Sequence, residues 1–317
     1  MKLCDMHCDT AMALYHGGKE LYSNDLHISL ERAAVFEKYL QLAAFFTSPR
    51  FSDEEGWEDF LRSRAYFLDQ CEKNNVSVLR SGEEIAAWDR LPGGGLPGTD
   101  GQFAVVLTVE DARILSGKIG RVGELYDLGI RVVTPLWGGD TCIGGSHDTD
   151  HGLTDFGREA VKEMLRVGIV PDISHASFRS ADEILDLCAA AGKSPVATHM
   201  NAYALHPHSR NLTDDRYLRL AELGGVAGIS LYVRHLSGAE EVTAEDAAKH
   251  LLHYETLCPG HAGFGCDYDG SDVPKDLAEI SRLPAAAEKL RALGMTEEQI
   301  DGIYYGNVLR FLVDTLR

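Results

Sequence analysis

Residues 168–199 read GIVPDISHASFRSADEILDLCAAAGKSPVATH. Short apolar runs at the beginning and the end of this stretch flank an amphipathic segment at 180–191, which is the pattern of a strand, a helix and a second strand. The two strands end in His175 and His199. A helix that connects two strands makes them parallel, so we expect the two imidazoles to lie side by side at one edge of a sheet.

The same alternation continues along the whole chain. Strands are predicted at residues 2–9, 39–47, 103–110, 131–137, 168–175, 195–199, 225–232 and 263–267. Helices are predicted at residues 53–74, 120–128, 155–166, 180–191, 214–223 and 244–257. Eight strands alternating with helices favour a (β/α)8 TIM barrel over an open sheet, because such barrels take about 250 residues or more. No Gly-x-Gly-x-x-Gly follows the first strand, which argues against a dinucleotide-binding fold. Without a linker, we expect one domain over residues 1–317.

The charge balance excludes several kinds of partner. Thirty Lys and Arg stand against 49 Asp and Glu, a net charge of −19, whereas nucleic-acid backbones and anionic membranes attract basic surfaces. No run approaches the ~18 apolar residues that span a bilayer. The first residues lack the apolar segment and small-residue cleavage site of a signal peptide. We therefore expect a cytoplasmic protein without nucleic-acid or membrane partners.

The cysteines do not indicate a disulfide framework or a thiolate zinc site. There are seven of them, an odd number, scattered and without a Cys-x-x-Cys pair. We expect reduced thiols, most of them buried.

Side chains with metal-binding chemistry stand at the ends of the predicted strands. In a (β/α)8 barrel these ends form the mouth where the active site lies. Three imidazoles and three carboxylates would converge there, and nitrogen and oxygen donors of this kind suit Zn²⁺. The set consists of His7, Asp9, Glu110, His175, His199 and Asp267.

Some of these donors have a simpler interpretation when they are taken alone. His7 and Asp9 are two residues apart and so share a face of a strand, but an isolated His-x-Asp is also typical of a surface ion pair. Glu110 ends an apolar strand and can bridge two cations through its two oxygens, and no lysine stands at a predicted strand end to replace it. Asp267 or Asp269 would face the site, with Asp269 the more natural turn residue. The convergence of all the donors favours the metal site.

Several motifs together resemble the membrane dipeptidase (renal dipeptidase) family, which are zinc peptidases of the amidohydrolase superfamily. The most specific stretch is His199-Met200-Asn201-Ala202-Tyr203, followed by Ser209-Arg210-Asn211 and Asp214-Asp215. Further matching motifs lie at residues 5–9, 152–157, 172–175, 263–270 and 307–310. The resemblance covers nearly the whole chain and implies a (β/α)8 barrel, commonly dimeric, so a homodimer is a further expectation.

The resemblance also implies two Zn²⁺ per subunit as cofactors. His7, Asp9 and Glu110 would bind one ion, and Glu110, His175 and His199 the other. A hydroxide that bridges the two ions would attack the scissile carbonyl of a dipeptide, including dipeptides with a C-terminal D-residue.

Other positions match the family's substrate-handling residues. Asp267 corresponds to the acid near the bridging water, and we assign it the proton transfer to the leaving amine. Arg210 matches the arginine that holds the free carboxylate of the dipeptide, and Tyr232 matches a tyrosine beside it. The alternative for Arg210 is a surface ion pair with Asp214 or Asp215.

One position departs from the family pattern. Mammalian members have a substrate-binding histidine after the fourth strand, where this sequence has Trp137. Trp137 is accordingly expected to contact substrate. His147 and His151 follow in the next loop, where they either replace that histidine or, as we rather expect, lie on the surface.

Three functions therefore remain open. The first is a dinuclear zinc dipeptidase. The second is another amidohydrolase, such as a deaminase, lactonase or phosphoesterase, with the same metal ligands. The third is a metal-binding scaffold without turnover.

Overall fold

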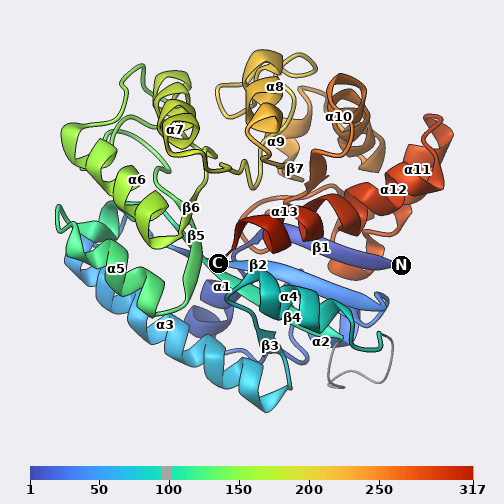
Figure 1. Ribbon diagram of the computed structural model, residues 1–317. Coiled ribbons are helices and arrows are strands. Elements are labelled where there is room, and N and C mark those ends of the chain that lie inside the picture. The colour runs from blue at the N-terminus through green and yellow to red at the C-terminus, as the bar shows by residue number, and fades with distance from the viewer. Residues whose placement is uncertain (94–101, 317) are drawn as a thin grey trace.

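The computed structural model describes residues 1–93 and 102–316, and its centre is one parallel sheet (Figure 1). The strands are β1 (Lys2–Cys8), β2 (Lys38–Phe46), β3 (Ser77–Val78), β4 (Phe103–Glu110), β5 (Ile130–Thr134), β6 (Val170–Pro171), β7 (Ala227–Ile229) and β8 (Ala262–Phe264). They lie in the order β6-β5-β4-β2-β1-β8-β7, with β3 beside β4. The two ends of this order are β6 and β7.

The segment at residues 196–197 joins β6 to β7 and closes the sheet. Val196 pairs with Asp172, just after β6, and Ala197 pairs with Ala227 of β7, both in parallel. The predicted (β/α)8 barrel is therefore confirmed. The strand expected at 195–199 is present only as these two bridges, and the short β3 was not predicted.

Helices surround the barrel (Figure 1). They are α1 (Thr10–Gly17), α2 (Leu30–Ala33), α3 (Asp53–Lys73), α4 (Gly82–Asp89), α5 (Gly120–Asp127), α6 (Asp155–Val167), α7 (Phe178–Ala191), α8 (Asp214–Glu222), α9 (Val233–Leu236), α10 (Ala244–Leu257), α11 (Ala285–Ala292), α12 (Glu297–Asp301) and α13 (Asn307–Thr315). All six predicted helices are present within two residues of their expected bounds. No helix in the described part of the chain combines the length and the apolar character needed to cross a membrane.

Helix α6 illustrates how the sequence sets these elements. Thr154 Oγ1 accepts a hydrogen bond from Gly157 N at 2.9 Å, which caps the first turn. Gly168 ends the helix in a left-handed conformation with φ 100°. Between these two residues, the side chains on one face are buried against the barrel, among them Val161 and Met164.

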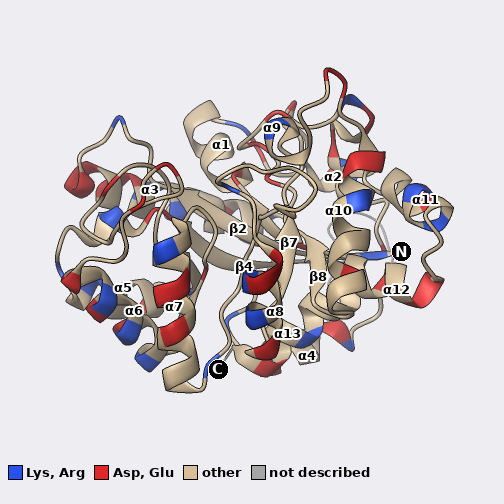
Figure 2. Ribbon diagram, turned by 90° about the horizontal axis from the view of Figure 1, so that it is seen from above, with Lys and Arg blue, Asp and Glu red and all other residues tan. Residues whose placement is uncertain are grey.

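The interior of the barrel is apolar near the beginning of the strands. Alternate strand residues such as Cys4, Leu40 and Val106 form one buried cluster with Val308 and Leu312 of α13. Helices α4 and α13 lie at this end of the barrel, and α1 and α9 lie at the other (Figure 2). Polar side chains are therefore expected at the other end of the barrel, the mouth formed by the C-terminal ends of the strands.

Gly265 is required where the chain after β8 crosses the bridging segment. A Cβ atom at Gly265 would lie 1.7 Å from Thr198 O, so a side chain there forces the backbone apart. We expect Gly265→Ala to lower the melting temperature by roughly 2–5 °C, since overpacking of this kind costs about 1–3 kcal/mol. Thermal unfolding measures the effect. The control is Gly123→Ala in α5, where a Cβ meets nothing within 4 Å and stability should hold or rise slightly. Equal melting of the Gly265→Ala variant and the wild type would contradict the close approach.

Candidate metal centre

The six donors predicted at the strand ends lie together at the mouth of the barrel. His7 Nε2 lies 3.6 Å from Asp9 Oδ2 and 3.8 Å from Asp267 Oδ1. The same nitrogen lies 3.7 Å from Glu110 Oε2. His7, Asp9 and Asp267 thus form one group of donors, with Glu110 at its edge.

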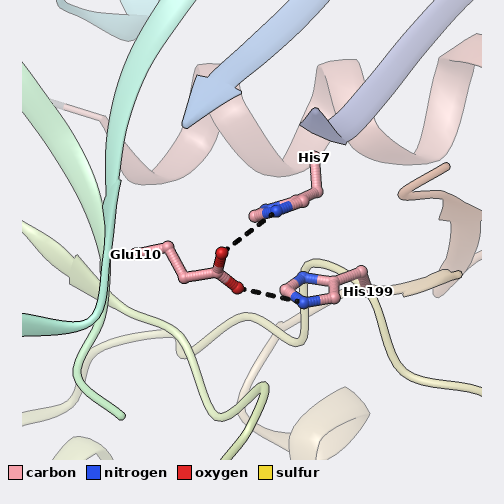
Figure 3. Close-up of side chains that lie close together, drawn as sticks. All are labelled: His7, Glu110 and His199. Carbon is pink, nitrogen blue, oxygen red and sulfur yellow. Dashed lines mark ion pairs between the residues drawn. The ribbon is translucent and has the colours of Figure 1, made fainter. Parts of the chain in front are cut away.

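The other oxygen of Glu110 faces a second group of donors. Glu110 Oε1 lies 2.8 Å from His175 Nε2 and 3.3 Å from His199 Nε2. The two imidazole nitrogens are 2.9 Å apart, so the histidines of consecutive βα units do lie side by side. Figure 3 shows Glu110 between His7 and His199, with one oxygen directed to each. A carboxylate placed in this way has the geometry to bridge two ions.

An irregularity in β1 brings His7 to the mouth. The pairing of β1 with β2 shifts between Asp5 and Cys8, so the simple alternation of side chains is interrupted. The Asp5 carboxylate accepts hydrogen bonds from His7 N at 3.3 Å and from Cys266 N at 2.8 Å, which holds the irregular backbone. Asp9 follows directly as the N-cap residue of α1. Cys8 packs in the core outside the barrel, as expected.

Two of the donors have a left-handed backbone. His175 has φ 65° and Asp267 has φ 62°. This region costs roughly 1–3 kcal/mol for residues with a side chain, and such residues cluster at functional sites. Both residues lie beyond the observed ends of β6 and β8, at Pro171 and Phe264, so the regular strands stop earlier than the sequence predicts.

A buried carboxylate ties the strands under the histidines. Asp172 Oδ1 accepts hydrogen bonds from Ser174 N at 2.8 Å and from Thr198 N at 3.0 Å. Its other oxygen accepts from Thr134 Oγ1 at 2.6 Å and from Thr198 Oγ1 at 2.5 Å. Asp172 thus joins β5, β6 and the bridging segment. In the sequence, Asp172 belongs to the motif at 172–175, but this role was not predicted.

Hydrogen bonds also orient the two imidazoles. His175 Nδ1 lies 2.9 Å from Trp137 O, and a carbonyl can only accept, so Nδ1 carries the proton and Nε2 presents its lone pair to the centre. His199 Nδ1 lies 2.8 Å from Thr198 Oγ1. Such partners are typical of metal-binding histidines.

The carboxylates of the site favour the binding of a cation. Burial raises the pKa of Glu110 and Asp9, and raises that of Asp267 to about 7. Burial opposes the protonation of His7, but Glu110, Asp9 and Asp267 overcome it and raise the pKa of His7 to about 10. Several carboxylates held so close together stabilise any positive charge between them.

The two other histidines are held neutral. Burial lowers the pKa of His175 and of His199 well below the usual value. Neutral imidazole is the form that binds metal ions.

Buried atoms without a partner point to the same conclusion. Among the described residues, His7 Nε2, Asp9 Oδ1 and Glu110 Oε1 are buried and take part in no hydrogen bond. Buried polar atoms are rarely left in this state. Within each of two groups, His7 with Glu110 and His199 and His7 with Asp9 and Asp267, the donor atoms all lie within 4.8 Å of one another. Donors of this type, number and spacing fit Zn²⁺.

A cavity of about 870 Å³ opens above the donors. Arg210, Tyr232 and Trp137 all line it, together with Glu110 and Asp267. The cavity therefore brings the predicted substrate-binding side chains and the candidate metal ligands into one space.

Arg210 is buried in the wall of this cavity. Its side chain does not form the alternative surface ion pair, since the residue is only 2% exposed and Asp214 pairs instead with His253 Nε2 at 2.8 Å. Within the described structure, Nε and Nη1 of Arg210 have no hydrogen-bond partner. Burial lowers the pKa of Arg210 to about 10, so the guanidinium stays charged at neutral pH. A buried, unpaired cation in a cavity is suited to bind an anionic group.

His147 lies in the cavity wall, contrary to the surface position that we favoured. Its backbone N donates to His175 O at 2.8 Å, which draws the loop after β5 over the mouth, and its ring centroid is 6.0 Å from that of His175. Burial lowers the pKa of His147 to about 3. His151 is exposed, as expected, and pairs with Asp140.

His235 and Phe46 also line the cavity and were not predicted. His235 belongs to α9, and its ring centroid lies 4.5 Å from that of Tyr232. Phe46 ends β2. The one signal in the sequence was their place near the ends of predicted strands, Phe46 within the strand at 39–47 and His235 just after the strand at 225–232.

Comparison with known proteins gives a family match over nearly the whole chain. The model of the membrane dipeptidase family (peptidase family M19) matches residues 1–315. Two uncharacterized dipeptidases of Schizosaccharomyces pombe are 33% and 30% identical over 223 and 214 residues. These alignments cover 67% and 65% of this chain and 53% and 51% of the relatives. The matched region thus spans about half the length of these curated relatives.

Solved structures share the fold. A metallo peptidase from Rhodobacter sphaeroides, liganded with a phosphinate mimic of the dipeptide L-Ala-D-Ala, superposes with a TM-score of 0.87 at 24% identity over 100% of this chain and 99% of that one. A probable dipeptidase from Pseudomonas aeruginosa has a TM-score of 0.85 at 16% identity over 100% of this chain and 96% of that one. At these identities the likeness concerns the fold.

Proposed function

Because this chain belongs to the membrane dipeptidase family, we propose that it hydrolyses the peptide bond of dipeptides with two Zn²⁺ bound at the mouth of the barrel. One observation carries the proposal. Glu110 lies between two groups of buried donors, and the unpaired Arg210 lines the same cavity.

The donors divide naturally into two subsites. His7, Asp9 and Glu110 would hold one ion, and Glu110, His175 and His199 would hold the other. Zn²⁺ bound there supplies a Lewis acid for the scissile carbonyl and lowers the pKa of a coordinated water.

Arg210 would bind the free carboxylate of the dipeptide. Its Nε and Nη1 are unpaired, and a guanidinium grips a carboxylate with two parallel hydrogen bonds. With the carboxylate held at Arg210 and the scissile carbonyl at the donors, the cavity measures the length of the substrate and favours two residues. Tyr232, which lines the cavity with Arg210, would assist this contact.

Asp267 would carry the proton. The three imidazoles at the centre are committed to metal, which leaves the Asp267 carboxylate to take a proton from the attacking water and give it to the leaving amine. Ser230 Oγ donates to Asp267 Oδ2 at 3.4 Å, so Oδ1 is left to face the centre.

D-residues at the second position belong to the proposed substrate range. The support is that the Rhodobacter sphaeroides metallo peptidase with this fold binds a mimic of L-Ala-D-Ala.

The direct test combines elemental analysis with a substrate screen. We expect the purified protein to bind two Zn²⁺ per chain and to hydrolyse members of a panel of L-L and L-D dipeptides. A protein that binds no metal and stays inactive when zinc is supplied would contradict the proposal.

Arg210→Ala separates a dipeptidase from other amidohydrolases. We expect kcat/KM on dipeptides to fall roughly 100-fold, since a charge-assisted contact is worth about 1.5–3 kcal/mol. The matched control is Arg179→Ala, whose side chain is 68% exposed on α7 and should leave the rate unchanged. An unchanged rate in Arg210→Ala, or equal losses on dipeptides and on dipeptide amides, would count against the carboxylate contact.

A further inference from the structure

Phe46 and Trp137 form an aromatic wall in the cavity. Phe46 is the last residue of β2, and Trp137 stands three residues after the end of β5. The two ring centroids are 4.9 Å apart, and both side chains are partly exposed where they line the cavity. Met12 of α1 lines the same cavity. We call Phe46, Trp137 and Met12 the apolar wall.

The apolar wall flanks the strand of the central carboxylate. Phe46 is the register partner of Glu110 between β2 and β4. On the other side of β4, Glu110 pairs with Thr134 of β5, and Trp137 follows Thr134 in the chain. The two aromatic residues therefore come from the strands on either side of β4, the strand that ends in Glu110.

Arg210 enters the cavity from the other side of the barrel. In the closed order of strands, β2 and the bridging segment at 196–197 stand on opposite sides of the ring. Arg210 follows that segment, and Tyr232 follows β7, the next strand. Of the donors, Glu110 ends the strand beside Phe46, and His199 follows the bridging segment on the opposite side of the ring.

We propose that the apolar wall is the subsite for the side chain of the first residue of the dipeptide, and that the protein prefers a large apolar first residue. This inference rests on the proposed function. A dipeptide held by its carboxylate at Arg210, with its scissile carbonyl at the metal centre, has its first residue on the far side from Arg210. The side chain of that first residue would therefore contact the apolar wall.

The carboxylates that line the cavity offer an apolar side chain little burial, and the rings of Tyr232 and His235 line it together with Arg210. Other lining residues include Asp148, Asp267, Asp269 and Asp272, and these carboxylates favour polar groups. Aromatic rings supply large apolar contact area. An apolar first side chain is therefore buried best against Trp137 and Phe46.

The side chain of Trp137 can be changed without losing the hydrogen bond that orients His175. His175 Nδ1 donates to the backbone carbonyl of Trp137, which every substitution keeps. Trp137→Phe keeps an aromatic ring, and Trp137→Ala removes it. Zinc content of each variant, measured by elemental analysis, reports whether the centre stays intact.

The kinetic test compares dipeptides that differ only in the first residue. With L-Ala in the second position, we expect kcat/KM to rise from Ala to Leu to Phe in the first position, by about tenfold or more overall. Trp137→Ala and Phe46→Ala should bring this ratio close to one, and Trp137→Phe should keep most of it. The ratio between two different second residues should stay the same in all variants. A flat or reversed series in the wild type, or an unchanged ratio in Trp137→Ala, would overturn the inference.

A binding test gives a readout independent of turnover. The chain has three tryptophans, of which Trp57 and Trp88 are 9% and 2% exposed and do not line the cavity. We expect a phosphinate mimic with Phe in the first position to shift the fluorescence of zinc-loaded wild type and Trp57→Phe, but not that of Trp137→Phe. It should also bind about tenfold more tightly than the mimic with Ala.

The two proposals fail in different ways. Hydrolysis of dipeptides without a first-residue preference overturns the apolar wall alone. Absence of dipeptide hydrolysis overturns the proposed function, and equal or absent binding of the two mimics then overturns the wall as well.

Discussion

Glu110→Gln should abolish dipeptide hydrolysis and release zinc from both subsites. The two oxygens of Glu110 face different groups of donors, and the amide has no charge and one oxygen only. The loss of several kcal/mol of Lewis-acid stabilisation corresponds to a fall in kcat of about a thousandfold or more. Elemental analysis and steady-state kinetics on the same preparation measure both effects.

A surface residue provides the control for this variant. Glu124 is exposed on α5, and Glu124→Gln should keep full activity and both ions. Loss of only one zinc in Glu110→Gln would show that Glu110 serves a single subsite. Retention of both ions and of activity would contradict the bridging role altogether.

Asp267→Asn should separate proton transfer from metal binding. We expect kcat to fall about 10²–10⁴-fold, the usual contribution of a general acid–base group, while zinc content stays near that of the wild type. The asparagine has the same shape but cannot take a proton from water.

The outcomes of Asp267→Asn also test the remaining alternatives. If the variant also loses zinc, the main role of Asp267 is to bind the metal ion. Activity within tenfold of the wild type would assign the proton transfer to another group. A wild type as inactive as the variant, with zinc bound, would favour the scaffold without turnover.

The barrel and its donors could be predicted from the sequence because strand ends are local features. Apolar runs that finish in His7, Glu110 or His199 are visible in the chain, and parallel strands bring their C-terminal ends to one edge. The structure places those residues together. Their roles as ligands stay predictions that the variants above address.

Features that depend on distant contacts could not be predicted in this way. The position of His147 follows from its hydrogen bond to His175, and that of Arg210 from the burial of its loop. The left-handed backbone of His175 and Asp267 has no glycine or asparagine to signal it. β3 has two residues, too few for any alternation to be recognised.

The pairing of β1 with β8 has a consequence for how the protein is made. It brings His7 next to Asp267, 260 residues further along the chain, so the mouth holds all six donors only after these two distant strands have paired. Contacts between such distant segments form late and slowly. A metal ion that binds the complete donor set would therefore favour the closed barrel over partly folded chains, and its uptake would report the closure of the barrel.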